Sequence, residues 1–104
     1  MAFGESDNIL WHLVAGTRGG PNRLQILYAL SEEPQNANQL AKTTGLDYKT
    51  IRHHLEILVE NGLVRASQET RYGELYYLTE FAKEKLKVFD AIWKKFEKND
   101  LGKG

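Results

Sequence analysis

The chain is 104 residues long, contains no cysteine, and carries 14 basic and 14 acidic side chains, so its formal net charge is zero. This length suits one domain that buries a hydrophobic core without disulfide bonds. A sequence without cysteine excludes disulfides and thiolate metal sites. It also has no apolar run long enough to span a membrane and no signal peptide at its start. We therefore expect a single cytoplasmic domain over residues 1–104, with no membrane partner.

Two helical patterns open the chain. The first covers about residues 5–16, where apolar side chains recur on one side at helical spacing. A glycine-rich stretch at 16–20 interrupts the pattern, and we interpret it as a linker. Pro21 then suits the first turn of a second helix, because that turn does not need its missing N–H. The second helix is predicted to end near Ser31.

Capping residues predict two further helices. Asn36 and Gln39 have the spacing of a capping box at the start of a short third helix, and Gly45 suits its C-terminal cap. Asp47 is a favourable N-cap for a fourth helix over about residues 48–61. The apolar residues of this fourth helix fall on one side, so its opposite side is expected to face outward.

The second half of the chain predicts a hairpin and one long helix. Residues 63–67 and 74–78 have the composition of short strands, and a polar loop at 68–73 joins them. Thr79 would cap a last helix that continues to about Lys98. The expected fold class is mainly α with a small β-hairpin wing. Its element order is four helices, two strands and a helix, which is a winged helix-turn-helix.

The third and fourth helices are separated by only three residues, 45–47. Such a short turn with a glycine makes two helices cross steeply, and the second can then enter the major groove of DNA. The outward face of the fourth helix begins with side chains that can contact phosphates and base edges, namely Tyr48, Lys49, Thr50, Arg52 and His53. Acidic Glu56 and Glu60 follow only in later turns. This gradient favours DNA contact over a face that is merely solvated.

The hairpin is expected to supply a second DNA contact. Arg71 and Tyr72 lie in its loop and Arg65 lies on its first strand. An arginine on a projecting loop can reach phosphates or the flanking minor groove, although an ordinary solvated turn is the alternative. His54 lies between the outward face and the core. It either hydrogen-bonds a phosphate or packs between helices, and the sequence leaves both interpretations open.

Residues 38–64, and above all the run Tyr-Lys-Thr-Ile-Arg-His-His-Leu at 48–55, resemble the winged-helix core of ArsR-type regulators. With the run Arg-Gly-Gly-Pro-Asn-Arg at 18–23, this stretch is similar to the archaeal branch of that superfamily. Residues 75–79 extend the resemblance over about 18–80. The resemblance implies a homodimer that binds palindromic promoter DNA. It places DNA contacts at the positions that match Tyr48, Lys49, Thr50, Arg52, His53 and His54.

Many ArsR-type proteins sense metals, but this sequence lacks their ligands. The third helix has no cysteine pair, and Asp90 on the last helix has no histidine near it in sequence. His53 and His54 are adjacent, so they point about 100° apart and do not chelate one ion readily. We expect no metal and no other cofactor, whereas a small-molecule or protein effector stays open. The common catalytic motifs are also missing, so we do not expect an enzyme.

The last helix carries a wide apolar stripe that predicts a dimer. A small domain does not obviously cover the whole stripe, and uncovered apolar patches usually mark interfaces. The expected interface residues are Trp11, Phe89, Ile92, Trp93 and Phe96. The alternative is that the stripe packs within one chain. A two-fold dimer would place two recognition helices about 34 Å apart, one turn of DNA.

A second functional hypothesis is a winged-helix interaction module that binds protein without touching DNA. The zero net charge favours this hypothesis to some degree, because many DNA-binding domains are basic. The charge distribution adds little, because residues 42–72 carry five basic and four acidic side chains. Any DNA contact therefore depends on a few well-placed side chains.

Overall fold

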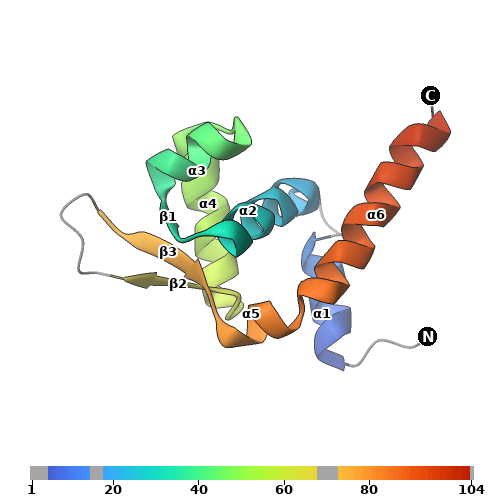
Figure 1. Cartoon of the computed structure of the whole chain (residues 1–104), viewed down its shortest axis with the longest axis horizontal. Coiled ribbons are helices and arrows are strands. Elements are labelled where there is room, and N and C mark those ends of the chain that lie inside the picture. The colour runs from blue at the N-terminus through green and yellow to red at the C-terminus, as the bar shows by residue number, and fades with distance from the viewer. Residues whose placement is uncertain (1–4, 15–17, 68–72, 104) are drawn as a thin grey trace.

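A computed structural model of the chain describes residues 5–14, 18–67 and 73–103, with side chains at 10–14, 18–67, 73–95 and 97. The elements are α1 (Glu5–Val14), α2 (Gly20–Glu32), β1 (Gln35–Asn36), α3 (Ala37–Thr44), α4 (Tyr48–Glu60), β2 (Val64–Ser67), β3 (Leu75–Leu78), α5 (Glu80–Glu84) and α6 (Leu86–Lys103). The hairpin β2–β3 projects at one end, and α1 and α6 lie side by side at the other (Figure 1). This arrangement confirms the predicted fold class. None of the described helices is both long and apolar enough to cross a membrane.

The predicted capping residues set the bounds of α3 and α4. The backbone N–H of Gln39 donates to the Asn36 side chain at 2.8 Å, and the Gln39 side chain accepts from the Asn36 backbone at 2.8 Å. Gly45 ends α3 with φ 79°, a left-handed conformation that favours glycine. Asp47 caps α4 as expected. Two helices joined by three residues follow directly from these local signals.

One strand was not predicted. The two residues of β1 pair antiparallel with β3, with Gln35 opposite Tyr76, and give the sheet the order β1-β3-β2. The Gln35 side chain is buried, donates to the Ala29 carbonyl at 3.1 Å and accepts from the Thr43 hydroxyl at 2.9 Å. A two-residue strand is too short for an alternating pattern, so only this tertiary pairing defines it.

The prediction of one continuous last helix is wrong. Thr79 does act as an N-cap, because its hydroxyl accepts from the Ala82 N–H at 3.1 Å, but the helix it starts is the short α5. Lys85 then leaves helical geometry with φ −95° and ψ 9°. The bend between α5 and α6 is visible in Figure 1, and it lets α6 pack along α1 and α2.

The core is one buried cluster around α2, which contacts α1, α3, α4, α6 and β3, and it includes two residues expected at a dimer interface. Phe89 and Ile92 on α6 are 1% and 0% exposed within the single chain. Their assignment to an exposed interface patch is therefore wrong, because α1 and α2 already cover that side of α6. Trp11 and Trp93 are half-buried. The Phe96 side chain lies outside the described residues.

Ile92→Val should lower the free energy of unfolding by about 1 kcal/mol, because it removes one methylene from a filled core. The loss should be the same at every protein concentration, since the side chain packs within one chain. Chemical denaturation at several concentrations measures this effect. A destabilisation that disappears on dilution would instead return Ile92 to an interface between chains.

Candidate nucleic-acid interface

The first turn of α4 is held by its N-cap. The Thr50 N–H donates to Asp47 Oδ1 at 2.8 Å, and the Thr50 hydroxyl donates to Asp47 Oδ2 at 2.9 Å. These two hydrogen bonds, the backbone one foremost, lower the pKa of the Asp47 carboxyl. The Thr50 hydroxyl proton is thus engaged in the cap. Its oxygen can still accept a hydrogen bond from a base.

The outward face of α4 matches its predicted exposure. Lys49, Arg52 and His53 are exposed, and Tyr48 is 50% exposed. The opposite side of the helix is buried through Ile51, Leu55 and Leu58. Glu56 and Glu60 are also exposed but lie in the later turns. The helix therefore presents its cations at the N-terminal end and its acids towards the C-terminal end.

Arg52 is held by a partner that the sequence did not reveal. Its Nη1 donates to the phenol oxygen of Tyr76 on β3 at 3.1 Å. Burial raises the pKa of Tyr76, against the opposing effect of Arg52, so the phenol is neutral at physiological pH. Alternation along β3 could have shown that Tyr76 points inward with Leu78. It could not have shown which helix side chain meets it.

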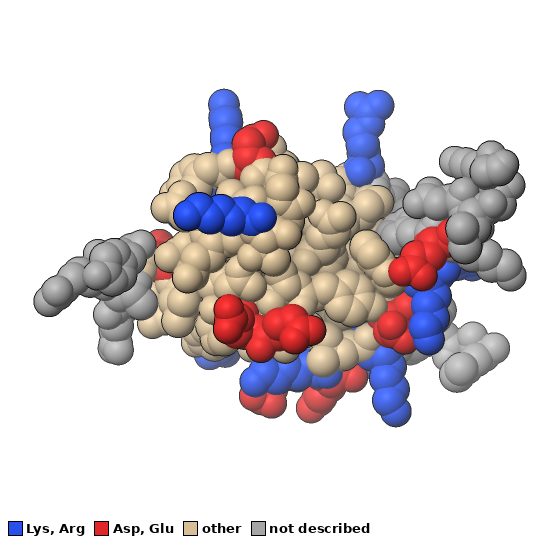
Figure 2. All heavy atoms as spheres, turned by 45° about the horizontal axis from the view of Figure 1, so that its top comes forward, with Lys and Arg blue, Asp and Glu red and all other residues tan. Residues whose placement is uncertain are grey.

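The loop end of the hairpin and the start of α4 line one depression. Tyr48 and Arg52 line a depression of about 190 Å³ together with Asn38 from α3 and Gly73 and Glu74 from the hairpin. Glu74 lines the same depression as Arg52 and hydrogen-bonds the Tyr76 side chain. In the view of Figure 2, basic and acidic side chains intersperse around a large uncharged surface, without a broad basic patch. On the face drawn in this view, any electrostatic attraction of DNA would come from single side chains.

His54 is a core residue. It is 5% exposed, and Arg23, equally buried on α2, places Nη1 3.3 Å from its Nδ1. Because a guanidinium only donates, Nδ1 must be the acceptor. Burial, then the charge of Arg23 and then that of His53, lower the pKa of His54. The packing interpretation of His54 is therefore correct, and the expectation that it contacts DNA is wrong.

The buried guanidinium also ties α1 to this centre, because Arg23 Nε donates to the Leu13 carbonyl at 2.9 Å. Gly19, which has no Cβ, leaves room for the Arg23 side chain beside His54. A Cβ there would lie 2.7 Å from His54 Cε1 and 2.9 Å from Arg23 Nη1. A Cβ at Gly20 would lie 2.1 Å from the Val14 carbonyl oxygen. The glycine-rich stretch that the sequence suggested as a linker thus includes a point of close packing between α1, α2 and α4.

Of the predicted hairpin residues, the described one, Arg65, does not line the depression that Tyr48 and Arg52 line. Arg65 is exposed, faces Tyr77 across the hairpin and lines a groove with Val59 and Phe81. Arg71 and Tyr72 lie outside the described residues. Among residues 5–14, 18–67 and 73–103, no three His, Asp or Glu side chains form a group that could hold a metal ion.

The buried His54 predicts a loss of stability in acid. Its folded-state pKa lies below its unfolded value, so the unfolded chain binds more protons as the pH falls below about 6.5. Its contribution is present above that pH and is lost as the pH falls through the folded pKa. His54→Gln should flatten the acid side of the stability profile measured by denaturation, whereas His53→Gln at the exposed neighbour should not. Equal effects of both variants would contradict the role of burial.

Comparison with known proteins supports the same architecture. Residues 20–66 match the model of the family described as "Bacterial regulatory protein, arsR family". No curated protein sequence matches the chain significantly. Among solved structures, a probable transcriptional regulator from Pseudomonas aeruginosa is 24% identical with a TM-score of 0.74, over 94% of this chain and 76% of its own.

Two further structures have the same fold. The transcriptional repressor CouR, bound to a 23-mer DNA duplex, is 20% identical with a TM-score of 0.69, over 92% of this chain and 70% of its own. The repressor BigR from Xylella fastidiosa is 25% identical with a TM-score of 0.65, over 91% of this chain and 86% of its own. The chain thus has the winged helix-turn-helix fold of transcriptional regulators, and its residues 20–66 match the arsR-family helix-turn-helix.

Proposed function

We propose that the protein is a sequence-specific, DNA-binding transcription regulator that acts as a homodimer and reads the major groove with α4. The arsR-family match and the regulators of the same fold indicate a DNA-binding transcriptional regulator. The single observation that carries the proposal is the exposed start of α4, where the cations Lys49 and Arg52 share one face with His53. A helix-turn-helix uses this part of its second helix to contact bases.

Arg52 is the side chain best placed to read a base. A guanidinium can donate two hydrogen bonds to O6 and N7 of guanine. The hydrogen bond to Tyr76 restricts Arg52 before DNA is bound, which reduces the entropy lost on binding. Lys49 suits a phosphate, because its compact charge has no planar geometry to match to a base edge. His53 lies beside Arg52 on the same face and extends the contact.

The hairpin would lie over DNA that flanks the α4 site. Its loop, residues 68–73, contains Arg71 and Tyr72, and Arg65 lies on β2. Arginines of this kind bind phosphates or a narrow minor groove. We assign these three residues to flanking contacts, separate from the base contacts of α4.

A second copy would pack at the end formed by α1 and α6, opposite the hairpin (Figure 1). Trp11 keeps part of its surface exposed, and Lys95 Nζ lies 5.1 Å from the centre of its ring. Trp93, whose ring packs against Tyr28 of α2, would lie at the edge of this interface. Phe96 follows on α6. This interface is smaller than the apolar stripe alone suggested, because Phe89 and Ile92 are already buried. Two copies would double the phosphate contacts of a chain with no net charge.

The remaining features of the proposal follow from its similarity to ArsR-type regulators. We propose that residues 1–104 form one DNA-binding domain with dimerisation helices at both ends, and that it acts in the cytoplasm on promoter DNA. The runs at 18–23 and 48–55 favour the archaeal branch of the superfamily. That affiliation stays a prediction from these two runs.

Arg52→Ala should weaken binding to the protein's own promoter by about 1–3 kcal/mol and relax specificity at one base pair. Lys49→Ala should weaken binding to all sequences alike and flatten the salt dependence. Lys87→Ala, on the exposed side of α6, is the matched control and should change neither. Gel shifts at several salt concentrations measure all three. A winged-helix module that binds only protein would show no effect of Arg52 or Lys49.

Light scattering after size exclusion should give the mass of two chains at micromolar concentration. Trp11→Ala should weaken that dimer about tenfold or more, as loss of a central tryptophan does at many interfaces. Circular dichroism of the variant checks that the fold is retained. A wild-type protein that elutes as a monomer at these concentrations would remove the dimer from the proposal.

A further inference from the structure

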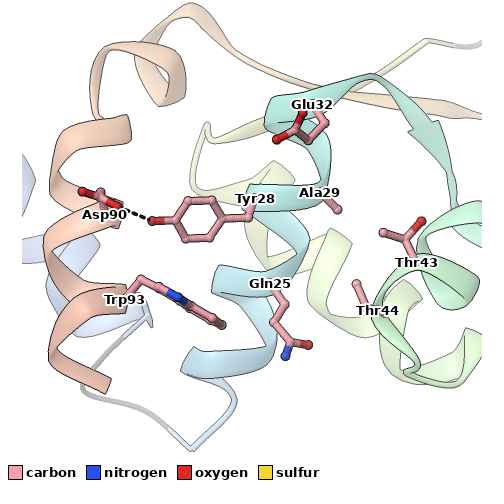
Figure 3. A pocket seen from close by; sticks show the side chains of 8 residues that line it. All are labelled: Gln25, Tyr28, Ala29, Glu32, Thr43, Thr44, Asp90 and Trp93. Carbon is pink, nitrogen blue, oxygen red and sulfur yellow. Dashed lines mark hydrogen bonds between the residues drawn. The ribbon is translucent and has the colours of Figure 1, made fainter. Parts of the chain in front are cut away.

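A pocket of about 490 Å³ opens between α2, α3 and α6. It is separate from the candidate DNA-binding face of α4. Its lining residues are Gln25, Tyr28, Ala29, Glu32, Thr43, Thr44, Asp90 and Trp93 (Figure 3). In this view the rings of Tyr28 and Trp93 lie on the α6 side, and Thr43 and Thr44 lie on the α3 side. The volume is within the range of small-molecule sites, about 300–1,000 Å³.

Two aromatic rings from different helices form one wall. The ring centres of Tyr28 and Trp93 are 5.5 Å apart and their planes meet at 71°. The Tyr28 hydroxyl donates to Asp90 Oδ1 at 3.2 Å, which fixes the ring against α6. The Trp93 indole N–H donates to Glu97. Aromatic faces that line a pocket attract ammonium groups.

The charged groups around the pocket are mainly acidic. Glu32 and Asp90 are the two charged residues of the lining, and the lining contains no lysine or arginine. Lys94 Nζ lies 3.1 Å from Asp90 Oδ2 and balances one of these charges, whereas Glu97 adds another carboxylate beside Trp93. Burial, followed by Asp90 and then Glu97, raises the pKa of Tyr28 to about 12. The phenol therefore stays neutral in a negative field.

The backbone adds to this negative potential. Ala29 and Glu32 belong to the last turn of α2, and Thr43 and Thr44 belong to the last turn of α3. Helix C-termini carry a partial negative charge and stabilise cations. The last turn of α2 contains no basic residue that would neutralise it. The last turn of α3 does contain one, Lys42, so the uncompensated end of α2 and two carboxylates face the same space.

We propose that this pocket binds a small organic cation. Its positive group would lie between Glu32 and Asp90, and its apolar part would pack against Tyr28 and Trp93. An organic anion of the same size would be repelled by the carboxylates and the end of α2. An uncharged analogue would keep only the aromatic contacts.

The position of the pocket also suggests what the cation does. Thr43 and Thr44 are on the first helix of the helix-turn-helix pair, whereas Asp90 and Trp93 are on α6, where we place the dimer contact. A molecule that touches both would stabilise one orientation of the DNA-reading helices relative to α6. This effector role rests on the proposed function, but binding of the cation does not.

The test is a titration of the ¹⁵N-labelled full chain with benzyltrimethylammonium chloride, followed by NMR. The chain has two tryptophans, so the indole N–H of Trp93 should shift and that of Trp11 should not. Glu32→Gln should weaken binding about three- to fivefold, as expected for one exposed charge. Glu33→Gln, the next residue along and outside the pocket lining, is the matched control and should bind like the wild type.

Several outcomes overturn the proposal. These are the absence of a shift at Trp93, equal weakening by the two glutamate variants, or binding of phenylacetate or benzyl alcohol as tight as that of the cation. Gel shifts with and without benzyltrimethylammonium test the effector role separately. Cation binding without a change in promoter affinity removes that role. Cation binding by a protein that never binds its promoter leaves the site standing and overturns the DNA-binding proposal.

Discussion

The buried contact between Arg23 and His54 is the constraint on which the arrangement of the helices depends. One guanidinium on α2 donates to a carbonyl at the end of α1 and to a ring nitrogen on α4. Burying a charge is costly unless its hydrogen bonds are made, so these two contacts fix how the three helices meet. Gly19 and Gly20 permit the close approach, because any side chain there would overlap its neighbours.

This contact divides α4 between two tasks. The inner side of α4 packs in the core and includes His54. The outer side carries the exposed cations Lys49 and Arg52 in its first turns. Adjacent residues, His53 and His54, therefore have opposite surroundings although their ring centres are only 5.5 Å apart. Tyr76 connects α4 to the hairpin, because its hydroxyl on β3 accepts a hydrogen bond from Arg52. The orientation of α4 thus depends on two polar contacts, His54 with Arg23 on α2 and Arg52 with the buried Tyr76 on β3.

The sequence predicted what is determined locally. The Asn36 capping box, the Asp47 cap and Gly45 act within a few residues, and helical spacing alone separated Lys49 and Arg52 from the core. What it missed depends on residues far apart in the chain. The strand β1 exists because β3 lies beside it, and His54 is buried because Arg23 meets it 31 residues away. The bend at Lys85, which allows α6 to pack against α1 and α2, is not marked by any clear pattern in the sequence either.

The balance of charges has a consequence for how such a protein would find its target. Non-specific binding to DNA is almost wholly electrostatic. A chain with no net charge, and with no broad basic patch on the face that Figure 2 shows, would therefore bind arbitrary DNA weakly. Few molecules would then be sequestered along the rest of the chromosome. The ratio of specific to non-specific binding would then depend on how well a few side chains match the base edges of the operator. Such a protein would be highly selective although its affinity for the operator is modest.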